Sequence, residues 1–392
     1  MSLIFLLLFL LNPFICILVY GLHLNLKTKI ETKNFYFFYF LLSVFLGFIN
    51  ITKVPESDLA HHATDYLNAR GLSIFQYLGL FGGGKEFVFY IFNYLFYYIS
   101  EGSIKFWILV LTVFAYFPFF VAVHKFQLSI NPKASYILFS ICIAAFFPQL
   151  FSLSAHLIRQ FIAGSIAIYF LVEKIAYRKN KWWLVILGSL IHSSSFILFI
   201  LGYISFLKDR PNKSNVVKYF FLFASLIGYQ LIATILLPFF SDIAGIGYAL
   251  NRASSDTKFE LDSFSYSNYL FIIIIITVMI KNVFTNNFFK KSTSIMFICN
   301  IVLIQIFFIL INIRQLELSN RLFFYLCFFF PLIIPLQFKF KRQTDLRKLI
   351  IIALIVFFAF RLDFGTWKYD SIPQLLTSSS FNFLTRHDFK NF

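Results

Sequence analysis

Long apolar runs recur along almost the whole chain, and they constrain the fold more than any other feature of the sequence. A run of about 20 apolar residues can cross the hydrocarbon core of a bilayer as a helix. Such runs recur from Ser2 to Phe360, with no polar block large enough to fold separately. Of the 392 residues, 59% are hydrophobic and 13% are charged, whereas soluble domains have about 25% charged residues. We therefore expect an all-α polytopic membrane protein, with residues 1–392 forming one transmembrane helical bundle.

The hydropathy pattern predicts about 10–12 spans. Two segments are irregular, because 87–100 is short and 183–206 carries the polar sequence HSSS at its centre. The N-terminal run lacks a basic segment and a small-residue cleavage site, so we interpret it as an uncleaved first span. The segments with the length of a crossing helix are 2–22, 34–52, 105–123, 135–153, 157–175, 217–238, 267–284, 294–313, 321–338 and 348–361.

The net charge of +17 is concentrated in short connections between the apolar runs. Short basic connections face the cytoplasm, so membrane topology accounts for the charge and no nucleic-acid partner is expected. All six basic connections lie on the same side of the membrane only if 87–100 does not cross and 183–206 folds back as a hairpin at HSSS. The basic connections are 23–33, 124–133, 174–181, 208–218, 281–291 and 339–348. The outer side then receives 53–86, 152–157, 239–266, 312–320 and the tail 362–392.

The sequence contains no recognisable metal or cofactor motif. Cys16, Cys142, Cys299 and Cys327 lie inside apolar runs without the spacing of a metal site, so we expect small buried residues at these positions. The sequence GGGK at 82–85 lacks the second half of a Walker phosphate-binding loop and predicts a flexible turn. We therefore expect neither a metal nor another cofactor.

The first outer segment combines carboxylates and histidines at helical spacing. If SDLAHHATDYL forms a helix, Asp58 and Asp65 lie on one face, with His61 or His62 between them. Such a face is either a solvated interfacial helix or a polar wall over a substrate cleft. In the second interpretation Asp58 or Asp65 is a candidate base, and Arg70 is a candidate anion contact.

Polar side chains also interrupt two apolar runs. Arg159 and Gln160 lie just inside an otherwise apolar helix, followed by small residues between 163 and 167 that let a second helix approach closely. A charge inside a span is costly and usually faces the protein interior or a wet cavity, although an arginine near a helix end can also extend to the headgroups. His192 and the serines that follow it either link two helix segments or belong to a site.

The segment INIRQLELSNRLFFYL carries the largest polar stripe of the chain. In a helix, Arg314, Glu317, Arg321 and Tyr325 lie at i, i+3, i+7 and i+11, so they share one face. A planar guanidinium binds phosphate oxygens with two parallel hydrogen bonds. This stripe is therefore either a phosphate site or a salt-bridged loop at the membrane surface.

These segments follow one another in an order that resembles the EpsG-like branch of the Wzy-type polysaccharide polymerases. The best matches are LIRQ with the following IH, and the late arginine and tyrosine near Arg321. The family's usual Gly-Thr-Asp-Tyr segment reads Ala63, Thr64, Asp65, Tyr66 here. The full order, over about residues 56 to 335, is Asp65 with Tyr66, EFVFYIFNYL, LIRQFIAGSIAIYFL, YRKNKWW, LGSLIHSSSFILF and NRLFFYL.

The resemblance implies a GT-C-like helical fold and a glycosyltransferase of the bacterial inner membrane. Such enzymes extend O-antigen, capsule or exopolysaccharide chains by joining polyprenyl-diphosphate-linked oligosaccharide repeats on the periplasmic face. A flippase and a chain-length regulator of the same pathway are the expected protein partners. No nucleotide is required, because the donor already carries its leaving group.

Diphosphate departure needs preorganised positive charge, and the acceptor hydroxyl needs a nearby base. The candidate bases are Glu317, Asp65 and His192. The residues expected to bind diphosphate or sugar are Arg159, Gln160, Arg314, Arg321, Tyr325 and Arg70. Two other functions stay open: a lipid-linked-oligosaccharide flippase or transporter, which also needs a basic cavity, and a membrane O-acyltransferase with His192 as base.

Overall fold

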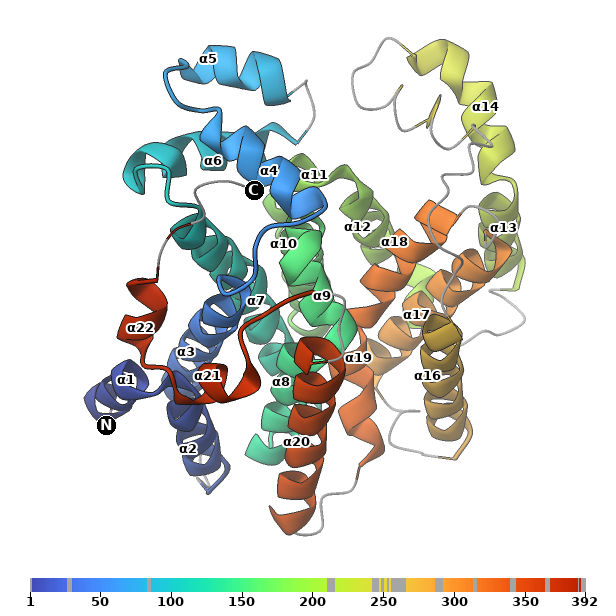
Figure 1. The fold of residues 1–392 in the computed structure, drawn as a ribbon. Helices are drawn as coiled ribbons and strands as arrows, with labels where there is room; N and C mark the ends of the chain where they lie inside the picture. The colour runs from blue at the N-terminus through green and yellow to red at the C-terminus, as the bar shows by residue number, and fades with distance from the viewer. Residues whose placement is uncertain are drawn as a thin grey trace.

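The chain folds into helices and connecting turns, and the prediction of an all-α fold is confirmed, since the described residues contain no strand. The structure is a computed structural model (Figure 1). It describes residues 2–26, 30–82, 86–209, 216–241, 247, 250, 251, 254, 266–285, 292–312, 316–338, 343–363, 367–386 and 388.

The first half of the chain supplies the central helices of the bundle. Figure 1 shows α3, α7, α8 and α10 in the middle, with α1 and α2 on one flank. These helices are α1 (Ser2–Leu11), α2 (Pro13–Leu26), α3 (Thr32–Asn50), α4 (Asp58–Leu67), α5 (Ile74–Tyr77), α6 (Phe87–Ile99), α7 (Ile104–Ile130), α8 (Ala134–Phe146), α9 (Pro148–His156) and α10 (Ile158–Ala176), with a short π-helix η1 (Leu78–Gly82) after α5.

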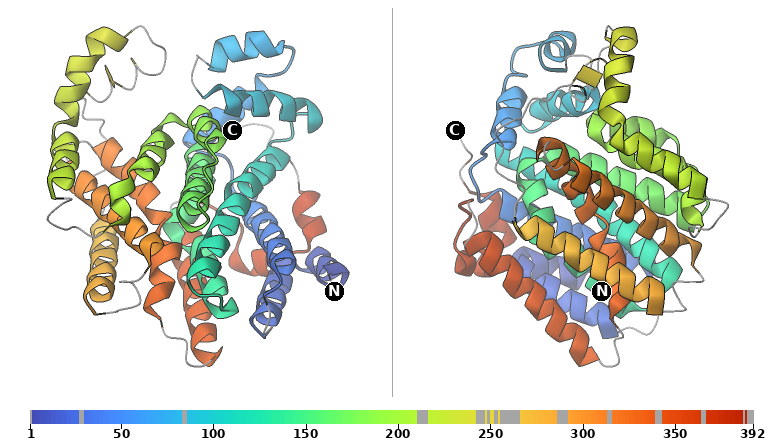
Figure 2. Two further views of the ribbon diagram at one scale, coloured as in Figure 1. Left: turned by 180° about the vertical axis from the view of Figure 1, so that it is seen from behind. Right: turned by 90° about the vertical axis from the view of Figure 1, so that its right-hand side faces the viewer.

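The second half of the chain completes the bundle, and α13, α14 and α16 form the flank opposite α1 and α2 (Figures 1 and 2). Its longer elements are α11 (Trp183–Ile191), α12 (Phe196–Tyr203), α13 (Val216–Ile227), α14 (Tyr229–Phe240), α16 (Tyr266–Thr285), α17 (Thr293–Ile311), α18 (Leu316–Cys327) and α20 (Gln343–Phe357). The short ones are η2 (Ser193–Ser195), η3 (Ser205–Lys208), α19 (Phe330–Ile333), η5 (Ile334–Gln337), η6 (Phe358–Asp363), α21 (Ile372–Thr377) and α22 (Ser380–Leu384).

Four stretches of the described chain are long and apolar enough to cross a membrane singly, or six if each bent pair of helices forms one span. The single spans are Thr32–Asn50, Ile104–Ile130, Thr293–Ile311 and Ser319–Leu336. The bent pairs are α8 with α9, at 50°, and α13 with α14, at 69°. Of the other predicted spans, 2–22 and 348–361 coincide with the shorter helices α1, α2 and α20, and 267–284 coincides with α16. The predicted span 157–175 coincides with α10, which carries Arg159, Glu173 and Lys174.

The N-terminal apolar run forms two helices, so the prediction of one continuous span over 2–22 is wrong. α1 ends at Leu11, and α2 begins at Pro13, whose backbone has no N–H to donate into the preceding turn. The Asn12 side-chain oxygen accepts from the backbone N–H of Ile15 at 2.9 Å, which satisfies one of the free donors at the start of α2.

Two of the basic connections, 124–133 and 174–181, meet at one end of the bundle, here called the basic end. Glu173, near the end of α10, is buried and pairs with Lys125 of α7 and with Lys181, which precedes α11. At the same end, the Tyr39 hydroxyl of α3 lies 2.7 Å from Nδ1 of His124. One carboxylate thus joins the connections at 124–133 and 174–181, as the predicted topology requires.

The segment 183–206 is a hairpin, as the position of HSSS predicts. α11 leads away from the basic end, η2 turns the chain, and α12 returns. The Tyr203 hydroxyl at the end of α12 donates to the Asn180 side chain just before α11, at 3.2 Å. With nine residues, α11 is about 14 Å long, which is too short to cross the roughly 30 Å hydrocarbon core.

The short helix α6 lies at the opposite end of the bundle, here called the Glu86 end. Glu86, which precedes α6, contacts the first residues of α10. In the middle of α6, Asn93 accepts a hydrogen bond from the Trp107 ring of α7 at 3.0 Å, and near the other end Tyr98 donates to the backbone of Ala69 after α4. Both ends of α6 therefore lie at the end where α7 and α10 begin, in agreement with the prediction that 87–100 does not cross.

Candidate active site at the Glu86 end

Glu86 joins three segments that are far apart in the sequence. One carboxylate oxygen accepts a hydrogen bond from Arg159 Nη1 at 2.6 Å. The other accepts from the backbone N–H of Ser193 at 3.0 Å and is hydrogen-bonded to Nδ1 of His192. We call Glu86, Arg159, His192 and Ser193 the Glu86 cluster. It joins the start of α6, the start of α10 and the tip of the α11–α12 hairpin.

The local backbone explains how each member reaches the cluster. Glu86 caps α6 with φ 51° and ψ 24°, a left-handed conformation that non-glycine residues seldom adopt. His192 is extended, with φ −155° and ψ 115°, where α11 breaks. Ser195 closes this break, because its hydroxyl donates to the His192 carbonyl at 2.8 Å. The Ser195 hydroxyl therefore satisfies a backbone carbonyl at the break, where His192 turns towards Glu86.

The cluster keeps Glu86 ionised. Burial by itself raises the pKa of the Glu86 carboxyl, but the hydrogen bond and charge of His192, the charge of Arg159 and the Ser193 N–H together lower it to about 2. The side chains of Glu86 and His192 are each 12% exposed and that of Arg159 is 20% exposed. The site is thus shielded from water but still accessible to a ligand.

The helix α18 adds polar groups from the predicted stripe. The buried Tyr325 hydroxyl lies 2.7 Å from the Ser194 hydroxyl, next to His192. One turn earlier, the backbone carbonyl of Arg321 accepts from the Gln160 side chain at 3.1 Å. Gln160, the Arg321 backbone and Tyr325 therefore lie next to the Glu86 cluster.

The predicted helix over SDLAHHATDYL is α4, and it brings Asp65 close to the cluster. His62 and Asp65 are both buried, with His62 Nδ1 at 3.8 Å from an Asp65 carboxylate oxygen. Burial lowers the pKa of His62, and the charge of Arg159 lowers it further. The Phe89 ring separates the two groups: it packs edge-on against His62 and lies 5.5 Å from the Arg159 guanidinium.

Some predicted site residues do not join this arrangement. Arg70 is exposed and makes no ion pair or hydrogen bond with a described residue, so the expected anion contact there has no support from the geometry. Arg314 lies outside the described residues, as does most of the loop 239–266. Glu317 belongs to α18, but its side chain is outside the described part of the structure.

His156, one turn before Arg159 in the sequence, contacts a different part of the chain. The helix breaks at Leu157, which has φ −105° and ψ 50° between α9 and α10. The His156 ring stacks on Trp367 of the C-terminal segment, with 3.5 Å between ring centroids. Its Nε2 lies 3.4 Å from a guanidinium nitrogen of Arg361. The break therefore directs His156 to the C-terminal segment rather than to the cluster.

Glu86 is the central residue that sequence reasoning did not select. One feature of the sequence could have pointed to Glu86: it is a single carboxylate immediately before an apolar segment, 87–100, that was not expected to cross the membrane. Spacing arguments on one helix cannot detect it, because each of its partners is more than 70 positions away. Among the described residues, no group of three or more His, Cys, Asp or Glu side chains is placed to hold a metal ion.

The fold and this arrangement define the class of protein: a polytopic all-α membrane protein with a buried charged cluster at one end of its bundle. A model of the EpsG family matches residues 36–377, which is most of the chain. The chain therefore belongs to the EpsG family, as the order of its motifs predicts. No curated protein and no solved structure matches it.

Proposed function

We propose that the chain is a polysaccharide polymerase that joins polyprenyl-diphosphate-linked oligosaccharide repeats, as O-antigen, capsule or exopolysaccharide polymerases do. The observation that carries the proposal is the Glu86 cluster, which places a histidine, a carboxylate and an arginine together at one end of a membrane bundle. Membership of the EpsG family agrees with this function. The enzyme would act on the periplasmic face of the bacterial inner membrane, beside a flippase and a chain-length regulator.

Arg159 and Arg321 would bind the diphosphate of the donor. Arg159 uses one of its five N–H donors on Glu86, and among the described residues no hydrogen bond engages the others. Arg321 is half-buried on the neighbouring helix, and Gln160 holds its backbone. Positive groups that are fixed before the reaction stabilise the charge that develops on the leaving diphosphate.

His192 is the base that the geometry favours among the three predicted candidates. Glu86 occupies Nδ1, and no described residue hydrogen-bonds to Nε2. This is the arrangement in which a carboxylate orients a histidine so that its second nitrogen can accept a proton. Asp65, in contrast, is buried between His62 and the Tyr90 hydroxyl, at 3.8 and 3.5 Å respectively.

The proposed reaction is one displacement at the anomeric carbon of the growing chain. The acceptor hydroxyl of a new lipid-linked repeat attacks this carbon, and His192 Nε2 takes the hydroxyl proton. The bond from the anomeric carbon to the diphosphate oxygen breaks with its electron pair. A new glycosidic bond forms, and polyprenyl diphosphate leaves as an anion beside Arg159 and Arg321.

The experiment is chain-length analysis of the surface polysaccharide in a strain whose own copy is replaced by a variant. Arg159→Ala, Arg321→Ala and His192→Ala should each leave single repeats attached to the outer surface and remove long chains. Arg178→Ala, an exposed arginine at the basic end, is the control and should leave chain length unchanged.

The outcome separates the proposal from the other two functions. Normal long chains in all three variants would overturn the polymerase assignment. Repeats trapped on the cytoplasmic leaflet would indicate a flippase instead. Chains of normal length that lack an acyl group would indicate an O-acyltransferase with His192 as its base.

A further inference from the structure

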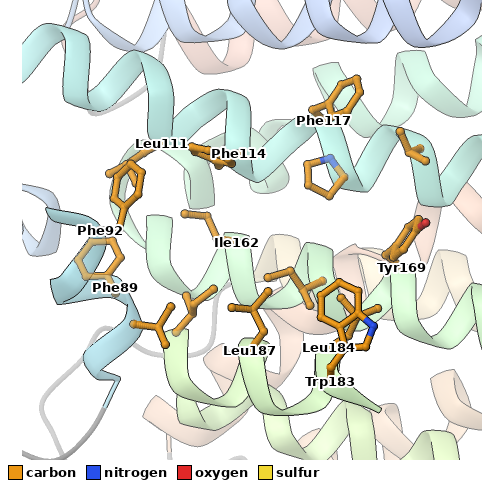
Figure 3. Close-up of a pocket in the computed structure, with 15 residues that line it drawn as sticks. Phe89, Phe92, Leu111, Phe114, Phe117, Ile162, Tyr169, Trp183, Leu184 and Leu187 are labelled. Atoms are coloured by element: carbon orange, nitrogen blue, oxygen red, sulfur yellow. The ribbon is translucent and has the colours of Figure 1, made fainter. Parts of the chain in front are cut away.

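An apolar groove of about 490 Å³ lies between α6, α7, α10 and α11. Figure 3 shows Phe89 and Phe92 at one end of it and Tyr169 and Trp183 at the other. Every lining side chain is apolar except for the Tyr169 hydroxyl and the Trp183 indole N–H, which both lie at the second end. The groove therefore suits a hydrocarbon chain along most of its length.

The groove is continuous with the Glu86 cluster at its first end. Phe89, which lines the groove, lies 5.5 Å from the Arg159 guanidinium. Ile162 lines it one helical turn after Arg159, and Ile191 lines it immediately before His192. The walls formed by α6, α10 and α11 thus each include a residue close to the cluster.

The groove also has the depth and the opening that a membrane lipid needs. Along α7 it extends from Leu111 to Val121, a rise of about 15 Å at 1.5 Å per residue. That is about half of the hydrocarbon thickness of a bilayer. Phe114 on one wall and Trp183 on another are each 51% exposed, so the groove opens sideways on the apolar surface of the bundle.

We infer that this groove holds the isoprenoid chain of a polyprenyl diphosphate while the diphosphate lies at Arg159. The inference rests on the proposed function, because that function supplies a substrate with an anionic head and a long apolar tail. Charge complementarity selects this occupant: the apolar walls lead directly to an arginine with unused N–H donors. Ordinary bilayer lipid is the alternative occupant, and the experiment distinguishes the two.

The test uses the full chain in phosphatidylcholine nanodiscs and a long-chain polyprenyl diphosphate with a diazirine in its isoprenoid chain. Illumination followed by peptide mapping should place the label on groove residues of α6, α7, α10 or α11. Unlabelled polyprenyl diphosphate should compete with the probe, whereas phosphatidylglycerol at the same concentration should not. Equal competition by phosphatidylglycerol, or labelling outside these helices, would overturn the inference.

A matched pair of variants blocks the groove or leaves it open. Leu187→Trp places a large ring in the groove, whereas Ile186→Trp adds the same ring at the neighbouring position, which is 51% exposed and does not line the groove. We expect Leu187→Trp to reduce labelling at least about fivefold and Ile186→Trp to leave it unchanged; equal labelling of the two variants would count against the groove. The wild-type labelling pattern tests the inference even if Leu187→Trp fails to fold.

Failure of the groove and failure of the proposed function give different results. If the wild type is labelled in the groove but makes no long chains, the polymerase assignment fails and the groove stands. If the wild type makes long chains and Leu187→Trp polymerises and is labelled normally, the groove fails and the polymerase assignment stands.

Discussion

Glu86 controls the geometry of the candidate site through one carboxylate. It contacts Arg159 with one oxygen and His192 with the other, so the two residues that we propose as phosphate ligand and base are held next to the same carboxylate. Its left-handed backbone is uncommon for a residue with a side chain. Strained conformations of this kind persist where surrounding contacts determine them, and they are frequent at functional sites.

Replacing Glu86 by Gln should reduce the yield of long-chain polysaccharide more than it reduces the amount of folded protein in the membrane. Glutamine keeps the shape but loses the charge that orients His192 and pairs with Arg159. Because a general base contributes about 10²- to 10⁴-fold to rate, we expect a loss of about tenfold or more in long-chain polysaccharide. Chain-length analysis together with the amount of protein in the membrane measures this effect.

The control for this prediction is Glu56→Gln, which neutralises an exposed carboxylate before α4. It should leave chain length unchanged. If Glu86→Gln makes chains of normal length while His192→Ala makes no long chains in the same strain, His192 acts without Glu86.

Glu86 should also make stability dependent on acid pH. Its pKa is about 2 in the folded chain and about 4.3 in an unfolded chain. A carboxyl group with a lowered folded-state pKa contributes stability that is complete above the unfolded value and is lost as the pH falls towards the folded value. Between about pH 4.3 and 2 the melting temperature of the wild type should therefore fall more steeply than that of Glu86→Gln. Parallel slopes in thermal unfolding scans of the purified proteins would contradict this assignment.

At the scale of the helices, α10 is the element that holds the site in place. The small residues after Arg159 let its neighbours approach closely, as predicted. The Ser165 hydroxyl donates to the Ala115 carbonyl of α7 at 2.7 Å. On another side, a Cβ atom added at Gly164 would lie 2.7 Å from the Phe328 ring. Close packing on two sides fixes the first turn of α10, and with it Arg159 and Gln160.

Gly164→Val should destabilise the bundle by about 1–3 kcal/mol, the usual cost of overpacking a filled core. Phe328 is fully buried, and its ring centroid lies 5.0 Å from those of Phe119 and Phe161, so it cannot move away. Thermal unfolding in detergent measures the change.

The matched control is Gly79→Val in η1, because nothing lies within 4 Å of a Cβ atom added there. This variant should unfold within a few degrees of the wild type. Equal melting temperatures for the two variants would show that α10 and Phe328 do not pack as closely as the structure indicates.

At the scale of the whole molecule, the two ends of the bundle differ in chemistry. At the basic end, Glu173 joins the connections 124–133 and 174–181 through Lys125 and Lys181. The Glu86 end gathers α4, α6 and the candidate site. By the positive-inside rule the basic end faces the cytoplasm, so the site is expected to face outward, where lipid-linked repeats are polymerised under the proposed function.

Single-cysteine labelling should reveal this orientation in intact cells. The four native cysteines are buried, so they should react little with a membrane-impermeant maleimide. Ser73→Cys, at an exposed position after α4, should be labelled from outside. Lys179→Cys, at an exposed position of the basic end, should be labelled only after the cells are opened. The reverse pattern would invert the topology and place the site in the cytoplasm.

Much of the fold was predictable, because bilayer crossing depends on local properties. Apolar length selected α3, α7 and α17, and the break at HSSS selected the hairpin of α11 and α12. The failure at 2–22 is also local in origin, since Pro13 interrupts a run that hydropathy alone treats as continuous. A hydropathy average does not register a single residue that cannot donate its N–H.

The candidate site was predictable only in part. Arg159, Gln160 and His192 could be selected because a polar group inside an apolar run is costly. Arg321 and Tyr325 could be selected because their spacing places them on one face of a helix. Glu86 sits in a polar connection, where a carboxylate costs nothing, so its sequence context did not single it out. Arg70 shares that polar context, is exposed and makes no hydrogen bond or ion pair with the cluster.

That the chain is helical, is apolar enough to cross a membrane and carries its positive charge in short connections between apolar runs could be inferred from the order of residues alone. These properties depend on apolar length and local charge, which are written directly in the order of residues. The contacts of Glu86 with Arg159 and His192, and the apolar groove beside this cluster, became apparent only from the packing of the helices. Such contacts require helices remote in sequence to pack against one another, and neither spacing nor composition specifies which helices do so.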